Sequence, residues 1–317
     1  FRRVLFRSYT SGASESNNLA IKGIAQASRS TGRHMISTVL EHASVGGTLT
    51  ALQQQGWEVD LLDIQRDGTI DLEQLGDLLR KDTILVSVCA VDSELGTVQP
   101  IRQITEILKD FPNCRLHVDA TQAIGKTELV MDGVDTMSIA PHKFYGLNGS
   151  GLLLKKSSVI IEPQIHGGSS TTLYRSGTPA LALAVSIEKA LQLTLTQQEE
   201  RIRCVRQLNE YLKTALLHYP SVRINSPEGA VPHILNLSVQ GLKGTVFQRV
   251  LSERGVCVSV KSACSAEGTP SKAVFAVSGD RKNALSSWRV SLSHLTTREE
   301  LDEFLQVFDQ CYKELGP

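Results

Sequence analysis

Short apolar runs alternate with amphipathic segments through the first half of this 317-residue chain. The run from Thr83 to Ala90 contains apolar and small residues without alternation, which is typical of a strand buried on both faces. The pattern therefore predicts an α/β fold with a mostly parallel central sheet flanked by helices. The predicted strands are 34–38, 58–62, 83–90, 115–118 and 136–139, and the predicted helices are 17–28, 43–55, 71–80 and 101–109.

The hydrophobic pattern changes in the second half. A stretch rich in Glu, Gln and Arg predicts a long helix from Glu188 to His218. Beyond Ser221 the pattern predicts short strands at 222–224, 233–239, 256–260 and 288–292, with helices at 245–253 and 298–315. We expect a large domain over residues 9–200 and a smaller C-terminal α+β domain over 201–317.

Composition excludes several classes of partner. Thirty-three basic and 33 acidic residues give no net charge, so nucleic acid and anionic membranes are not expected partners. No apolar run reaches the roughly 20 residues of a membrane span, and no secretory signal opens the chain, so we expect a cytoplasmic protein. The six cysteines lack Cys-x-x-Cys spacing, which predicts reduced thiols and no dedicated metal site.

Two residues at predicted strand ends indicate chemistry. Asp119 follows the strand 115–118, and Lys143 follows the strand 136–139, so both come at the carboxyl edge where α/β sheets bind ligands. A buried carboxylate keeps the ring nitrogen of pyridoxal phosphate (PLP) protonated, and a lysine amine holds the aldehyde as a Schiff base. Either residue alone is better explained by a helix cap or a solvated surface; together they predict a PLP site.

Other segments fit this prediction, each with a structural alternative. The small-residue turn 10–18 offers free N–H groups to a phosphate, or is a simple N-cap. His42 either lies flat on a pyridine ring or is a hydrogen-bonded structural histidine, and the segment 174–179 is a second phosphate turn or a loop. Cys264 lies in a polar, small-residue loop where a thiol can be exposed and mobile. Arg289, inside an apolar strand, needs a carboxylate partner, either from the protein or from a ligand such as an amino-acid substrate.

These segments resemble the cysteine desulfurases of the NifS/IscS type, which are class V aminotransferases with the fold-type I PLP-dependent transferase fold. The resemblance runs from about Tyr9 to the C-terminus. Its motifs are TSGASESNN at 10–18, EH at 41–42, GTVQPI at 96–101, HVDATQ at 117–122, HKFYG at 142–146, RSGT at 175–178, SAC at 262–264 and RVSL at 289–292.

The resemblance implies a role for each matching residue. Lys143 would form the Schiff base and Asp119 would hold the pyridinium nitrogen, and the other cofactor-binding residues would be Ala13, Ser14, His42, Ser93, Gln122, Ala140, His142 and Thr178. Gln122 would bond the ring hydroxyl, His42 would stack on the ring and take part in catalysis, and Thr178 would reach the phosphate of the partner subunit in a homodimer. Arg289, with Ser93, would bind the carboxylate of L-cysteine. Cys264 would take up the sulfur as a persulfide and leave alanine.

Several positions depart from the family pattern. Asp92-Ser93-Glu94 replaces the usual Asn-Asn-Glu, Ala140 stands where a phosphate-binding serine is common, and Ser293-His294 replaces Gly-Arg. The family's opening strand and its Asp-Asn-Ala-Ala-Thr segment have no counterpart. We interpret residues 1–8 as a non-native leader on a chain that lacks the N-terminal segment.

The resemblance leaves alternatives open. The main hypothesis is a cysteine desulfurase that supplies sulfur to an iron–sulfur scaffold or a tRNA thiolation enzyme. A selenocysteine lyase, another class V enzyme and a noncatalytic scaffold paralogue are the alternatives. Cys264 favours sulfur transfer over transamination, since a transaminase has no use for an exposed thiol. Cys264 is also a candidate transient iron–sulfur ligand during handover.

Overall fold

The computed structural model describes residues 5–168, 173–261 and 268–316. The chain divides into two compact units. The first comprises Phe1–Asp63, Ile70–Val91 and Gln99–Thr196, and the second comprises Ile64–Thr69, Asp92–Val98 and Gln197–Pro317. The second unit thus includes two short segments from the first half of the chain, which the hydrophobic pattern does not indicate.

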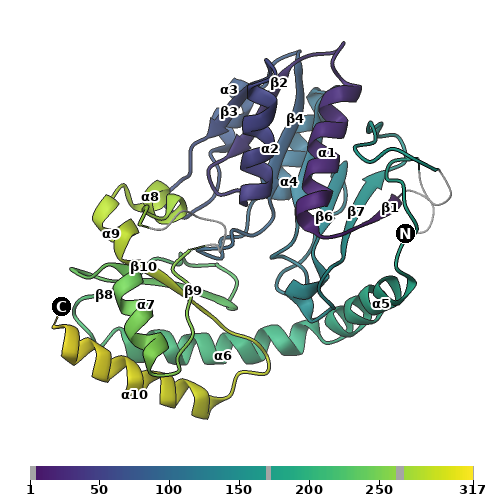
Figure 1. Cartoon of the computed structure of the whole chain (residues 1–317). Coiled ribbons are helices and arrows are strands. Elements are labelled where there is room, and N and C mark those ends of the chain that lie inside the picture. Colours follow the sequence, from purple (N-terminus) through teal and green to yellow (C-terminus); the bar gives the residue numbers. More distant parts are fainter. Residues whose placement is uncertain (1–4, 169–172, 262–267, 317) are drawn as a thin grey trace. The chain divides into compact units, whose positions relative to one another are not determined.

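The first unit is built on a seven-stranded sheet, in the order β1-β7-β6-β5-β4-β2-β3 (Figure 1). Strands β3, β2, β4, β5 and β6 run parallel, while β7 is antiparallel to both β6 and β1. The structure confirms the mostly parallel sheet. The strands are β1 (Leu5–Thr10), β2 (His34–Thr38), β3 (Glu58–Leu62), β4 (Thr83–Cys89), β5 (Arg115–Asp119), β6 (Thr136–Ile139) and β7 (Gly151–Lys156).

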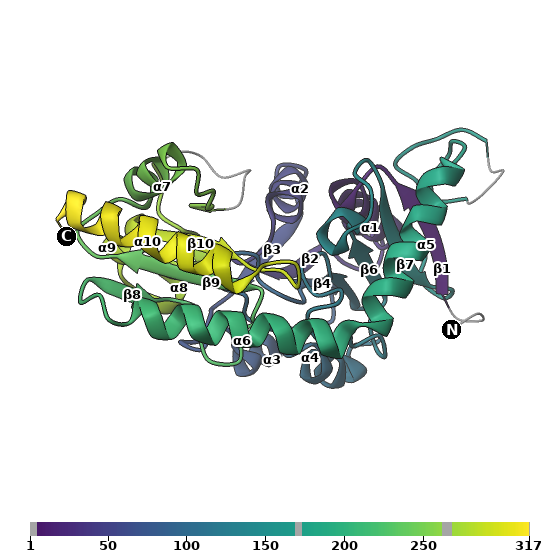
Figure 2. The same cartoon turned by 90° about the horizontal axis from the view of Figure 1, so that it is seen from below.

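Helices cover both faces of this sheet. Figure 2 shows α1 and α2 over one face and α3 and α4 over the other. Every side chain of β4 is buried, as its uninterrupted apolar sequence predicts for a strand covered on both sides. The helices of this unit are α1 (Ala13–Ala27), α2 (Ala43–Gln53), α3 (Leu72–Leu78), α4 (Ile101–Ile107) and α5 (Leu181–Thr196), with 3₁₀ turns η1 (Leu108–Asp110) and η2 (Pro141–Phe144).

The second unit has a three-stranded antiparallel sheet, in the order β10-β9-β8. Trp288 of β10 is fully buried in the hydrophobic core of this unit and stacks on Phe247, with ring centroids 5.4 Å apart, and Phe308 packs beside both. The elements are α6 (Gln198–Leu216), β8 (Val222–Ile224), β9 (Ile234–Val239), α7 (Gly244–Glu253), α8 (Lys272–Ser278), α9 (Arg281–Ser286), β10 (Ser287–Ser291) and α10 (Arg298–Leu315).

The structure corrects some sequence-based predictions. The segment 256–260 is not a strand; its pairing is an isolated bridge between Ser259 and Arg289. The predicted helix 188–218 is two helices that separate at Gln197, whose φ of −110° and ψ of 10° leave the helical region. The first helix begins at Ala13 rather than at Asn17. Strands β1 and β7 and helices α8 and α9 have no counterpart in the prediction.

Candidate functional site

The predicted acid and lysine emerge at the same edge of the first unit's sheet. Asp119 is the last residue of β5 and lies beside Ser138 of the parallel neighbour β6. Lys143 follows β6 within η2, and its side chain is exposed. This is the carboxyl edge, where α/β sheets bind ligands. The strand order therefore brings together two residues that are 24 positions apart in the sequence.

Asp119 is a buried carboxylate held by two donors. Its side chain is 5% exposed. One oxygen accepts a hydrogen bond from the Asn17 amide at 2.8 Å, and the other accepts from the backbone N–H of Thr121 at 2.9 Å. Because a carboxylate has about four lone-pair positions, Asp119 retains capacity for a further donor such as a protonated ring nitrogen.

His42 is connected to Asp119 through side chains. It is the N-cap of α2, and its Nδ1 accepts from the backbone N–H of Ser44 at 3.1 Å. The hydroxyl oxygen of Ser44 lies 2.8 Å from the same Nδ1 and accepts from the Asn17 amide at 2.9 Å. His42 is thus oriented by Ser44, and Ser44 shares the Asn17 amide with Asp119.

Glu41 places a second buried carboxyl group close to Asp119. One oxygen accepts from the backbone N–H of Cys89 at 2.7 Å and from the Thr38 hydroxyl at 3.0 Å. The other oxygen is buried and has no partner among the described residues. Burial, together with the charge of Asp119, raises the pKa of Glu41 to about 8 against the lowering effect of its hydrogen bonds. Glu41 is therefore protonated at neutral pH.

The predicted phosphate turn is the start of α1. Gly12 is the N-cap, and Ala13 and Ser14 are the first residues of the helix. The N–H groups of a first helical turn lack intrahelical partners, and the helix dipole favours an anion there. Gly151 of β7 packs closely against this turn, since a Cβ at Gly151 would lie 2.4 Å from the Gly12 carbonyl carbon.

An ion pair attaches the RSGT segment to the same turn. The Arg175 Nε lies 2.8 Å from a carboxylate oxygen of Glu15 in the first turn of α1. Thr178, three residues beyond Arg175, is exposed. The segment that contains Thr178 is thus attached near the start of α1 within one chain.

Three other predicted residues lie at the same edge with different surroundings. The Gln122 amide oxygen accepts from Lys126 at 2.6 Å. The His142 side chain is largely exposed, and its partial desolvation together with the neighbouring Lys143 charge lowers its pKa. Ala140 is buried and has no hydroxyl to offer a phosphate.

The predicted substrate residues belong to the second unit. Arg289 lies in β10, and one of its terminal nitrogens donates to the backbone carbonyl of Ser93. Its Nε is buried without a partner among the described residues. Burial lowers the pKa of Arg289, although the charges of Glu94 and Asp92 oppose this. A partly desolvated guanidinium with an unused donor suits a carboxylate.

The turn that carries Ser93 is held by Asp92. One carboxylate oxygen of Asp92 accepts from the backbone N–H groups of Glu94 and Leu95. The buried side chain has its pKa raised to about 7, because desolvation and the charge of Glu94 outweigh these bonds. Asp92, which stands where the family usually has asparagine, therefore accepts the backbone hydrogen bonds of a tight turn.

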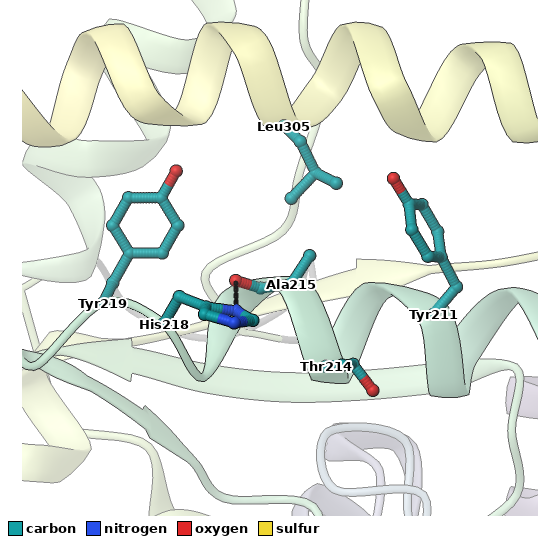
Figure 3. Close-up of a pocket in the computed structure, with 6 residues that line it drawn as sticks. All are labelled: Tyr211, Thr214, Ala215, His218, Tyr219 and Leu305. Carbon is teal, nitrogen blue, oxygen red and sulfur yellow. Dashed lines mark hydrogen bonds between the residues drawn. The ribbon is translucent and has the colours of Figure 1, made fainter.

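The other features of the chain add no described residue to the candidate site. Cys264 lies outside the described residues. A cavity of about 400 Å³ in the second unit is lined by α6, α10 and the turn after α6 (Figure 3), and none of its lining residues is a predicted site residue. Within the described ranges, no group of His, Cys, Asp and Glu is arranged to hold a metal ion. None of the described helices has the length and hydropathy of a membrane span.

The mostly parallel seven-stranded sheet, flanked by helices and with Asp119 and Lys143 at its carboxyl edge, matches the fold-type I class. The aminotransferase class-V family model matches residues 4–304. The chain belongs to this family.

The chain is similar to individual members of known sequence and structure over most of its length. A NifS/IcsS protein homolog of Lactobacillus delbrueckii subsp. bulgaricus is 39% identical over 311 residues, 96% of this chain and 81% of that protein. A cysteine desulfurase IscS of Dictyoglomus turgidum is 35% identical over 312 residues, 97% of this chain and 79% of that protein. A solved NifS-like protein has a TM-score of 0.91 and 31% identity, covering 97% of this chain and 82% of its own.

Sequence reasoning missed three residues of the site, Asn17, Glu41 and Ser44. Each lies in a motif or at a helix start that can be recognised in the sequence. Its hydrogen-bond partners, however, cannot be predicted from the sequence. The partner of Asn17, for example, is 102 positions away.

Proposed function

We propose that this chain is a PLP-dependent cysteine desulfurase. It converts L-cysteine to L-alanine and forms a persulfide on Cys264: the Cβ–S bond of the substrate breaks, an S–S bond forms to the Cys264 sulfur, and the thiol proton balances the new C–H bond of alanine. The observation that carries the proposal is the buried Asp119 beside the Lys143 turn at the carboxyl edge of the sheet. The relative named cysteine desulfurase IscS supports the choice of reaction.

The donor set of the first unit fits PLP. Bound PLP supplies an electron sink for the breaking bonds. Asp119 would hold a proton at the ring nitrogen, and Lys143 would hold the aldehyde group. The N–H groups at Ala13 and Ser14, with His142, would hold the phosphate. His42 would pack on the ring, and Gln122, whose amide oxygen now accepts from Lys126, would bind the ring hydroxyl. Ala140 contributes packing alone, which leaves the phosphate one donor fewer than the usual serine gives.

Arg289 binds the substrate carboxylate in this proposal. Its buried and unpartnered Nε is the donor that a carboxylate would take up. The Ser93 carbonyl, which accepts from the same guanidinium, fixes its orientation. Ser93 itself offers a hydroxyl where the family has an amide.

Sulfide and alanine production from L-cysteine tests the proposal, with added PLP and a thiol reductant. The chain should release the two products in equal amounts, and Cys264→Ser should release neither while still binding PLP. Cys257→Ser is the matched control, because Cys257 is an exposed cysteine seven residues earlier and should keep full activity. Release of sulfide by Cys264→Ser at the parent rate would contradict the assigned sulfur acceptor.

We also propose that the chain acts as a cytoplasmic homodimer that passes sulfur to an acceptor protein. Large apolar side chains of the first unit are exposed, including Leu173 at 70% and Leu181 at 77%. Large apolar side chains that gather on an exposed surface are typical of a protein interface, and we propose that these residues contribute to one. Thr178 lies between these two leucines in the sequence, which supports its assignment to the phosphate of the partner subunit. The acceptor would be an iron–sulfur scaffold or a tRNA thiolation enzyme.

A further inference from the structure

Asn17 is the branch point of a buried hydrogen-bond network in the first unit. Its side chain is completely buried in α1. Its amide nitrogen donates to Asp119 at 2.8 Å and to the Ser44 hydroxyl at 2.9 Å, and its amide oxygen lies 3.0 Å from Nε2 of His117. Both amide N–H groups are therefore used, and the amide oxygen is used as well.

The acceptors determine which way the amide points. A carboxylate accepts hydrogen bonds only, so the nitrogen of the Asn17 amide must face Asp119 and its oxygen must face His117. His117 then donates from Nε2, and its Nδ1 accepts from the Thr136 hydroxyl at 2.9 Å. Burial lowers the pKa of His117 to about 4, so the ring is neutral and has this one tautomer at neutral pH.

The second branch defines the tautomer of His42. Its Nδ1 accepts from the backbone N–H of Ser44, so this nitrogen carries a lone pair. The Ser44 hydroxyl, 2.8 Å away, must therefore donate to Nδ1 while it accepts from Asn17. The proton of neutral His42 is left on Nε2. The donors therefore follow one order through the network: His117 donates to Asn17, Asn17 donates to Ser44, and Ser44 donates to His42.

We propose that Asn17 is a positioning residue: it orients Asp119 and, through Ser44, His42, so that the ring-nitrogen acid and the imidazole are fixed together before PLP binds. This rests on the proposed function, which assigns Asp119 and His42 to the cofactor. A neutral amide suits this point, because its two N–H groups donate to Asp119 and Ser44 while its oxygen accepts from the His117 imidazole. An aspartate of the same shape would give Asp119 a like charge in place of a donor.

Nitrogen-15 NMR of the imidazole rings in the protein without PLP provides the first readout. The unaltered chain should show both His42 and His117 with the proton on Nε2. Asn17→Ala should alter both rings, and Ser44→Ala, which removes the hydroxyl between Asn17 and His42, should alter His42 alone. Asn209→Ala is the control, since Asn209 is also buried and its amide donates to the Pro232 carbonyl in the second unit. It should leave both rings unchanged.

PLP affinity, measured by titration, provides the second readout. Asn17→Asp and Asn17→Ala should weaken binding by about tenfold to a hundredfold, as expected for a lost hydrogen bond to a charged group. Unchanged imidazole signals in Asn17→Ala, or unchanged PLP affinity in both Asn17 variants, would overturn the positioning role alone. If the unaltered chain bound no PLP, the proposed function would fail and this assignment with it.

Discussion

Glu41 gives the first unit a stability that depends on pH. Its folded pKa, about 8, is above the unfolded value of about 4.3. Between these values the folded chain holds a proton that the unfolded chain has lost, so the contribution of Glu41 to stability falls as pH rises through this window. Burial of the Glu41 carboxyl group and the charge of Asp119 raise this pKa.

Glu41→Gln should remove this dependence. Glutamine keeps the oxygen that accepts from Cys89 and Thr38 but does not ionise. We expect the free energy of unfolding of the parent to fall more steeply from about pH 5 to about pH 9 than that of the variant. Urea unfolding of the protein without PLP measures both curves, and His117 and Asp92 contribute equally to each. Parallel curves would show that Glu41 is ionised in the folded chain at neutral pH.

Single residues mark the limit of what the sequence predicts. Asp119 and Lys143 could be predicted, because each follows a run that identifies itself as a strand and the ends of parallel strands meet at one edge. Asn17 could not, because its role depends on His117 and Asp119, which are 100 and 102 positions away. An asparagine in a helix start is otherwise indistinguishable from a capping residue.

At the scale of elements, the start of α1 is held against β7 by a contact that only glycine permits. A Cβ at Gly151 would lie 2.4 Å from the backbone of Gly12, closer than real side chains approach. Because neither partner is the flexible end of a side chain, the turn itself must move.

Gly151→Ala should therefore lower both stability and PLP affinity. Overpacking of this kind costs about 1–3 kcal/mol, and displacement of the first turn weakens the phosphate site. Gly76→Ala is the control: Gly76 lies inside α3 with open space around it, so alanine should raise stability by about 0.5–1 kcal/mol. Urea unfolding and PLP titration compare the three proteins. Unchanged stability and affinity in Gly151→Ala would mean that the turn tolerates a side chain.

The elements that sequence predicted best were those whose pattern is local. β2, β3 and β6 have the predicted bounds, because each is a short segment of extended-chain residues flanked by turn residues. The predicted strand at 256–260 was wrong because apolar β-branched residues favour extended backbone whether or not a partner strand is available; here the partner is a single bridge at Ser259. β7 was missed because its leucines suit a helix as well as a strand.

At the scale of the whole molecule, the division into units was harder to predict than the fold. The segments Ile64–Thr69 and Asp92–Val98 lie within the first half of the chain but belong to the second unit. The Asp92 turn brings the Ser93 carbonyl to Arg289, which is 196 positions away. A boundary drawn from a change of pattern near residue 200 cannot include such excursions, because their membership depends on long-range contacts.

The exposed apolar face of the first unit leads to a prediction about assembly. Leu181 and Val185 are 77% and 56% exposed and lie one turn apart on α5, so they share one side of the helix. Leu181→Glu with Val185→Glu should weaken self-association by about 100-fold or more, since a two-fold interface would bring like charges together. Leu295→Glu is the control, because Leu295 is 68% exposed in the second unit.

Sedimentation velocity over a range of concentrations measures the effect, and PLP titration of the same samples adds a second consequence. Thr178 lies three residues before α5, so if it serves the partner's phosphate, the double variant should lose PLP affinity as it becomes monomeric, with Leu295→Glu unchanged in both. A monomeric parent chain would contradict the homodimer. A double variant that is monomeric yet binds PLP as the parent does would keep the interface but remove Thr178 from the cofactor site.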